Sequence, residues 1–206
     1  GNSLIDMYAR CGAISDAHKI LNELSVRDVV SWSILIQVYA QKVQCQEAFN
    51  CFEQMQYEGL HPDEVTFVCV LSACSHSGLM KEAEILFSNM ARKYSVSPSI
   101  EHHNCMVIFL ACAGHFDKAM LLIKGMASSQ YPDLWLALLG ACRKWANVKL
   151  GKLVFDQILQ LDGNCTAAYV LMGNIFAASG LREDARKVEA MRLNYSAWHR
   201  SEKSIS

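Results

Sequence analysis

Apolar residues recur along the chain at helical spacing, in runs separated by glycines and polar turns. One kind of run has an apolar pair, such as Leu35-Ile36, followed three or four residues later by an aromatic residue or a cysteine. A second kind has a stripe with i, i+4, i+7 spacing, as in Ala48, Phe52 and Met55. Both spacings place the apolar side chains on one face of an α-helix, so the pattern predicts an all-α chain.

Two columns of equivalent positions repeat with the same irregular spacing. The small residue of the second run in each unit falls at Ala17, Ala48, Ala83, Ala119, Gly151 and Ala185. The residue two before the first apolar pair falls at Asn2, Ser33, Val68, Asn104, Leu136 and Val170. Both series advance by 31, 35, 36, 32 and 34 residues. These shared increments indicate about six units of two helices each.

A two-helix unit of this length cannot bury both of its apolar faces alone, whereas stacked neighbours can. The sequence therefore predicts an α-solenoid of stacked helix-turn-helix repeats, right-handed and with a concave inner surface. Glycine adopts positive φ without strain, so glycines are expected to end four of the first helices, at Gly12, Gly78, Gly114 and Gly180. Periodicity alone leaves the tetratricopeptide, HEAT and pentatricopeptide repeat families open.

Composition narrows the possible partners. The 206 residues are 52% hydrophobic and 19% charged, enough to bury a substantial core. A net charge of −1 argues against simple electrostatic binding to a phosphate backbone. The nine cysteines form no C-x-x-C pair, so we expect buried, reduced thiols. We expect no membrane partner, because no apolar run reaches the roughly 18 residues that a spanning helix needs.

No catalytic motif is apparent. The sequence lacks a Gly-rich phosphate loop, a G-x-S-x-G elbow and the H-x-E and P-C-x-x-C pattern of zinc deaminases. We therefore expect no catalytic residue, no metal, no cofactor and no small-molecule substrate. The tandem histidines His102 and His103 are expected to be groove or surface residues.

Several strings resemble a known family over residues 1–192. "NSLIDMYARCGAISDAHKILNEL", "RDVVSWSILIQVYAQ" and "EAFNCFEQMQYEGLHPDEVTFVCVLSACSHSGLMKEAEILFSNM" are similar to plant pentatricopeptide repeat (PPR) proteins. The unequal increments resemble the PLS subfamily, which alternates short, standard and long units. On this resemblance residues 1–28 end a short unit, 29–63 form a standard one, 64–99 a long one and 100–131 a short one.

The last third resembles the two E motifs that follow the repeats in organellar RNA-editing factors. "LWLALLGACRKWANVKLGKLVFDQILQLD" and "AAYVLMGNIFAASGLREDARKV" carry this similarity, within residues 132–192. The tail 193–206 diverges from the family. The resemblance implies a factor that specifies C-to-U editing sites in a mitochondrion or chloroplast. Through residues 132–192 it would recruit a DYW-type deaminase or another editing factor in trans. No targeting peptide is visible in this segment.

In this family each repeat recognises one RNA base through the fifth residue of its first helix and its last residue. The resemblance pairs Asn2 with Asp28, implying uridine, and Ser33 with Asp63, implying guanosine. Val30 and Val65 would sandwich the base that Ser33 contacts. Without the resemblance, Asp28 and Asp63 would be helix caps; capping and base recognition do not exclude each other.

The remaining repeats are less defined. Asn104 implies a pyrimidine, and its partner is either Tyr131 by register or Asp133 by chemistry. Val68 has no hydrogen-bonding group, so no base preference is expected from that long unit. Two alternatives to the editing factor stay open: a tetratricopeptide-type scaffold that binds peptides, and a factor that stabilises or helps to splice RNA.

Overall fold

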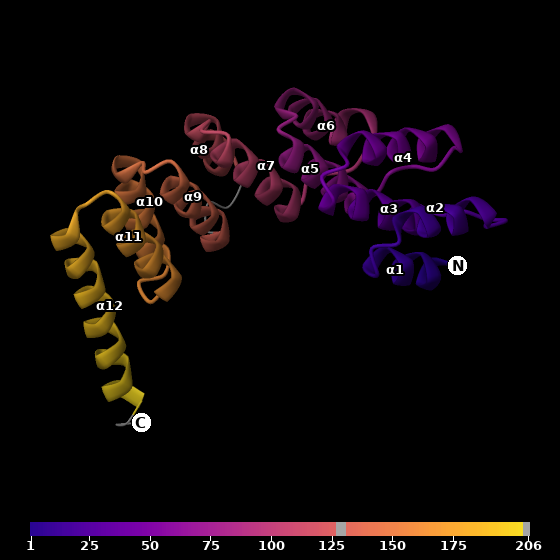
Figure 1. Ribbon diagram of the computed structural model, residues 1–206. Coiled ribbons are helices and arrows are strands. Elements are labelled where there is room, and N and C mark those ends of the chain that lie inside the picture. Colours follow the sequence, from indigo (N-terminus) through magenta and orange to yellow (C-terminus); the bar gives the residue numbers. More distant parts are fainter. Residues whose placement is uncertain (127–130, 204–206) are drawn as a thin grey trace. The chain divides into compact units, whose positions relative to one another are not determined.

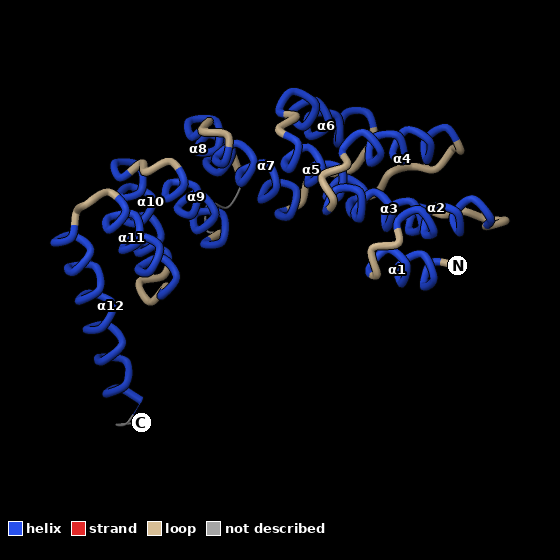
Figure 2. The backbone as a smooth tube through the Cα atoms, in the orientation of Figure 1, coloured by secondary structure: helices blue, strands red, loops and turns tan. Residues whose placement is uncertain are grey.

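The computed structural model describes the backbone of residues 1–126 and 131–203, and the side chains of residues 1–126 and 131–193. Twelve α-helices and no strand occur in this described part (Figures 1 and 2). They are α1 (Asn2–Arg10), α2 (Ile14–Glu23), α3 (Val29–Gln41), α4 (Cys45–Tyr57), α5 (Glu64–Ser77), α6 (Met80–Lys93), α7 (Ile100–Cys112), α8 (Phe116–Lys124), α9 (Pro132–Lys144), α10 (Val148–Leu161), α11 (Thr166–Ala178) and α12 (Arg182–Lys203). The predicted all-α repeat fold is confirmed.

The chain divides within α7 into two compact units, Gly1–Met106 and Val107–Ser206. In the first unit α1, α3 and α5 each pack against the helix that follows them, and α3 also packs against both α1 and α5. In the second unit α9 packs against α10 and α11, and α11 against α12. Each unit is thus built from helix pairs in contact with their neighbours, as the repeat pattern predicts.

Most of the small residues of the second helices are tightly packed. Ala17, Ala48, Ala83 and Ala119 are fully buried. Gly151 takes this position in α10, where an added Cβ would come within 3.3 Å of Ile175 Cδ1. A larger side chain at these positions would push neighbouring helices apart, which explains why small residues recur there.

The cysteines are free thiols, and several lie in the core. Cys51, Cys74 and Cys142 are buried, whereas Cys105 is partly exposed. Burial raises the pKa of the Cys51 and Cys74 thiols to about 12, so they stay protonated at neutral pH. The described residues contain no metal-binding cluster of His, Cys, Asp and Glu, and no described helix is both long and apolar enough to cross a membrane.

Six equivalent positions after the first helices have positive φ. Gly12, Gly78, Gly114 and Gly180 adopt φ of 80°, 73°, 83° and 77°, as predicted. In the second and fifth repeats the position belongs to Val43, with φ of 59°, and Ala146, with φ of 50°. A β-branched residue in the left-handed region is strained, so Val43 carries a local cost that glycine would remove.

Val43→Gly should raise the free energy of unfolding by about 1 kcal/mol, because relief of left-handed strain exceeds the added entropy of the unfolded chain. Urea denaturation of the two proteins measures this difference. Val26→Gly is the matched control: Val26 is 80% exposed and lacks positive φ, so its replacement should lower stability or leave it unchanged. Loss of stability in Val43→Gly would contradict the strain argument.

Candidate functional site

Two aspartates predicted as base-recognising residues cap the first helices of neighbouring repeats. The Asp28 carboxylate accepts a hydrogen bond from the Ser31 backbone N–H at 2.8 Å, and Asp63 accepts one from the Thr66 N–H at 2.8 Å. Each cap is reciprocal, because the Ser31 and Thr66 hydroxyls accept from the Asp28 and Asp63 backbone N–H groups at 3.0 and 3.3 Å. Both residues therefore form capping boxes, and the capping interpretation is confirmed for both.

The fourth repeat builds half of this arrangement with a histidine. Ser99 lies just before α7, and its backbone N–H donates to His102 Nδ1 at 3.0 Å. The opposite ring nitrogen, Nε2, lies 2.8 Å from the Glu64 carbonyl oxygen, to which it can only donate. The ring is thus neutral and fully buried, so the prediction that His102 is a groove or surface residue is wrong. His103 is partly exposed and contacts the Phe87 ring edge-on.

A chain of hydroxyl contacts joins the two predicted base-recognising residues of the second repeat. Ser33 Oγ lies 2.8 Å from Thr66 Oγ1, which donates to Asp63 Oδ1 at 2.8 Å. A hydroxyl can donate only one hydrogen bond. Because Thr66 Oγ1 donates to Asp63, it accepts a hydrogen bond from the Ser33 hydroxyl. Ser33 Oγ therefore keeps its lone pairs free, and Asp63 Oδ2 has no hydrogen-bond partner among the described residues.

Ser33 and Asp63 line one cavity of about 170 Å³. It contains four sequence-predicted residues, Val30, Ser33, Asp63 and Val65, together with Ile34 and Gln37. The valine side chains are 54% and 60% exposed, whereas Ser33 is 5% exposed. The cavity lining thus combines two exposed apolar side chains with two residues, Ser33 and Asp63, that each have an oxygen acceptor without a partner among the described residues.

The first repeat brings its predicted pair into direct contact. Asn2 Nδ2 lies 3.2 Å and 3.1 Å from the two Asp28 carboxylate oxygens. Because a carboxylate only accepts, the Asn2 amide must turn its nitrogen toward Asp28, and its carbonyl oxygen faces elsewhere. The Ser31 N–H holds the pKa of the Asp28 carboxyl below its ordinary value, helped by the Asn2 amide and opposed by partial burial.

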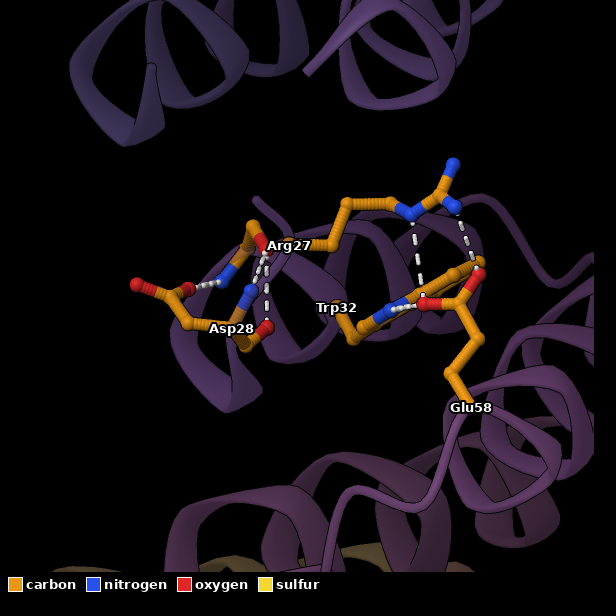
Figure 3. Close-up of polar contacts among 5 residues, drawn as sticks. Arg27, Asp28, Trp32 and Glu58 are labelled. Carbon is orange, nitrogen blue, oxygen red and sulfur yellow. Dashed lines mark hydrogen bonds and ion pairs between the residues drawn. The ribbon is translucent and has the colours of Figure 1, made fainter. Parts of the chain in front are cut away.

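Arg27 and Trp32 anchor the start of α3 on the side away from Asp28. Arg27 Nε and Trp32 Nε1 both donate to Glu58 Oε2 at 3.2 Å, and an Arg27 guanidinium nitrogen lies 3.0 Å from Glu58 Oε1. Glu58 directly follows α4. The Asp28 carboxylate points away from this cluster (Figure 3). The Arg27 charge is therefore neutralised by Glu58 of the next repeat and does not pair with Asp28.

The predicted residues of the fourth repeat, Asn104 and either Tyr131 or Asp133, show no hydrogen bond that joins them. Asn104 Oδ1 is buried and has no hydrogen-bond partner among the described residues. Tyr131 is the N-cap residue of α9, the position that Asp28 and Asp63 hold in α3 and α5. Asp133 lies two residues later, within the first turn. The register thus favours Tyr131 as the last residue of its repeat. RNA contacts by Asn104, Tyr131 or Asp133 stay predictions.

Thr66 and Gln37 are site residues that the sequence analysis missed. Thr66 supplies the hydroxyl that joins Ser33 to Asp63, and Gln37 extends the cavity lining. A signal for Thr66 exists: the strings "DVVS" and "DEVT" recur 35 residues apart and have the spacing of a capping box. Gln37 lies one helical turn beyond Ser33 on the same face, as i, i+4 spacing requires.

Asp28→Asn should flatten the acid limb of the stability curve without removing the cap, because asparagine caps as well as aspartate does. The folded-state pKa of Asp28 is lowered, so its stabilising contribution is present above its unfolded-state pKa and is lost as pH falls through the folded-state pKa. Wild type should lose stability relative to Asp28→Asn between about pH 5 and pH 2. Chemical denaturation across this range tests it; parallel curves would contradict it.

Matches to protein-family models cover residues 2–94, which is most of the first unit. A model described as "PPR repeat" matches residues 2–29 and 65–94, and one described as "PPR repeat family" matches 27–76. A pentatricopeptide repeat-containing protein of Arabidopsis thaliana is 39% identical over 193 residues, covering 94% of this chain and 38% of that protein. Another from the same plant, named mitochondrial, is 38% identical over 211 residues, covering 99% of this chain and 28% of that protein. The chain thus spans well under half of these relatives.

Solved structures share the fold. The PPR protein PPR10 in complex with an 18-nt psaJ RNA element superposes with a TM-score of 0.80 at 16% identity, covering 95% of this chain and 30% of that one. The PPR domain of Arabidopsis thaliana protein-only RNase P 1 in complex with tRNA gives 0.60 at 16% identity, covering 77% and 87%. These likenesses show the fold alone, an α-solenoid of helical repeats. The repeat matches over residues 2–94 and the plant relatives identify the chain as a pentatricopeptide repeat protein.

Proposed function

We propose that the chain binds single-stranded RNA, with one nucleotide facing each base-recognising repeat. The observation that carries this proposal is the cavity that combines Val30, Ser33, Asp63 and Val65. It has the flat apolar flanks and the polar edge that a nucleobase needs. Two of the similar structures, PPR10 with an RNA element and the RNase P 1 domain with tRNA, are complexes with RNA and support the proposal.

The second repeat is suited to guanine. Ser33 Oγ and Asp63 Oδ2 are both acceptors, and Thr66 holds them in place. The Watson–Crick edge of guanine presents two neighbouring donors, the imino N–H and the exocyclic amino group. An adenine or a pyrimidine would leave at least one acceptor facing another acceptor, which costs free energy at a partly buried site.

The first repeat is suited to uridine. The Asn2 amide nitrogen is engaged by Asp28, which leaves the Asn2 carbonyl oxygen as an acceptor for the imino N–H of uridine. Asn104 presents a buried carbonyl oxygen without a partner, and a base donor would satisfy it. We therefore propose a pyrimidine opposite Asn104.

Affinity should be modest for this segment. Stacking contributes about 1–3 kcal/mol per base, and part of it is lost to ordering the RNA. The net charge of −1 and the neutralised Arg27 provide little attraction for phosphates. Base-specific contacts, rather than charge, should therefore dominate discrimination.

We further propose that the chain helps to specify C-to-U editing sites in a mitochondrion or chloroplast. The resemblance of residues 132–192 to E motifs supports this, as do relatives whose names include "mitochondrial" and "chloroplastic". Residues 132–192 would recruit a deaminase from another chain. A transcript-stabilising or splicing factor would share the RNA contacts without this recruitment.

Ser33→Asn should shift the preferred base opposite the second repeat from guanosine to a pyrimidine, because the larger amide fills space that a purine needs. Binding of short RNAs that differ only at that nucleotide, followed by fluorescence anisotropy, measures the shift. Ser72→Asn, a partly exposed position on α5, is the control and should leave the preference unchanged. Unaltered guanosine preference in Ser33→Asn would refute the assignment of this base.

Thr66→Val should lower the free energy of unfolding by about 1–3 kcal/mol, because a buried hydroxyl that serves both Ser33 and Asp63 is lost at constant shape. It should also weaken guanosine preference, since Ser33 is then free to rotate its proton toward the base. Thr166→Val, at the exposed start of α11, controls for the substitution itself. Retention of full stability would show that the Ser33–Thr66–Asp63 chain is not formed in solution.

A further inference from the structure

Gln37 is a polar residue of the cavity lined by Ser33 and Asp63, and the proposed function gives it no role. It lies on α3 one helical turn beyond Ser33, so the two side chains share one face of the helix. Gln37 is exposed, and its side chain makes no hydrogen bond to any described residue. Its amide therefore brings one acceptor and two unused N–H donors to the cavity.

Two contacts show that α3 and α5 run in the same direction. Near the starts of the two helices, Ser33 Oγ lies 2.8 Å from Thr66 Oγ1. Further along both helices, the Ala40 carbonyl oxygen accepts a hydrogen bond from His76 Nδ1 at 2.9 Å. Because both contacts advance together along the two helices, positions on α5 can be compared directly with positions on α3.

The polar residues of the cavity follow one another along this common direction. Ser33 and Thr66 lie level with each other because their hydroxyls are in contact. Asp63 precedes Thr66 by three residues, and Gln37 follows Ser33 by four. At the rise of an α-helix, Asp63 lies about 5 Å before Ser33 along the helix direction, and Gln37 lies about 6 Å after it. The order is therefore Asp63, Ser33, Gln37.

The Watson–Crick edge of guanine presents three groups in a row: the exocyclic amino group, the imino N–H and the O6 carbonyl oxygen. With Asp63 opposite the amino group and Ser33 opposite the imino N–H, the order of the residues puts O6 on the side of Gln37. The reverse order would put O6 beside the Asp63 carboxylate, where two acceptors would face each other at a cost in free energy. O6 only accepts, and a Gln37 N–H is an unused donor on its side.

We infer that Gln37 is a third base-recognising residue of the second repeat, whose Nε2 donates a hydrogen bond to O6 of the bound guanine. This inference rests on the proposed base recognition and adds one donor to the two acceptors already assigned. The equivalent residues of the two repeats proposed to bind pyrimidines are Asp6, whose carboxylate accepts from Arg10 Nε, and Ile108, which has no polar group. Neither of them can donate, so the purine-binding repeat differs from both at this position.

The test pairs a change in this side chain with a change in one atom of the base. The whole chain is titrated into fluorescent oligouridines that carry one central guanosine, 6-thioguanosine or inosine. Sulfur at position 6 is a weaker acceptor than oxygen, and inosine lacks the amino group that faces Asp63. Gln37→Met removes the donor at similar length and should lower affinity for the guanosine RNA about threefold to tenfold. Wild type should bind the 6-thioguanosine RNA more weakly than the guanosine RNA, whereas Gln37→Met should bind both equally. The loss of affinity with inosine should be the same in both proteins.

Gln54→Met, at an exposed position of α4 outside the cavity lining, is the matched control and should change none of these affinities. Circular dichroism verifies the folding of both variants. An equal loss of affinity with 6-thioguanosine in wild type and Gln37→Met would overturn the inference. So would a loss with 2′-deoxyguanosine that occurs in wild type and not in Gln37→Met, because the amide would then contact the ribose. In both cases a retained preference for guanosine over inosine would leave recognition by Ser33 and Asp63 intact, whereas a wild type without any guanosine preference would refute both proposals.

Discussion

Two successive first helices of this chain, α5 and α7, have a hydrogen-bonded cap that reaches into the preceding repeat. Asp63 caps α5, Thr66 completes the cap, and the same threonine hydroxyl contacts Ser33 on α3. In α7 the third position of the helix is His102, and its ring reaches the Glu64 carbonyl oxygen. Because Ser33, Thr66 and His102 are buried, a repeat displaced from its neighbour would leave their polar atoms unsatisfied. The cap therefore sets the register between repeats.

That constraint also prepares the candidate RNA site. The Asp63 carboxylate uses one oxygen, Oδ1, for the cap, while Oδ2 has no hydrogen-bond partner among the described residues, and Asp63 lines the cavity. Thr66 accepts a hydrogen bond from the Ser33 hydroxyl, so Ser33 Oγ is available as an acceptor before any ligand binds. On the proposed function, structural stability and base discrimination would share the same atoms, as a preorganised site requires.

The sequence predicted the helices, their buried small residues and the glycines at positive φ, because each leaves a periodic signal. It also placed Val30, Ser33, Asp63 and Val65 at one site, through a family resemblance. It could not show the strained Val43, because a valine gives no sequence signal for the positive φ that this position adopts. It misplaced His102, since a histidine that replaces a capping hydroxyl has no distinct spacing. The direction of the Ser33 proton depends on Thr66 and required coordinates.

Methyl resonances of Val30 and Val65 test most directly whether a base enters the Ser33–Asp63 cavity. A titration of the isotope-labelled chain with a guanosine-containing tetranucleotide should shift both valines upfield, because the ring current of a stacked base acts on methyl groups above and below its plane. The exposed Val26, which is outside the cavity lining, should not move. Saturable RNA binding with unchanged Val30 and Val65 resonances would contradict the account.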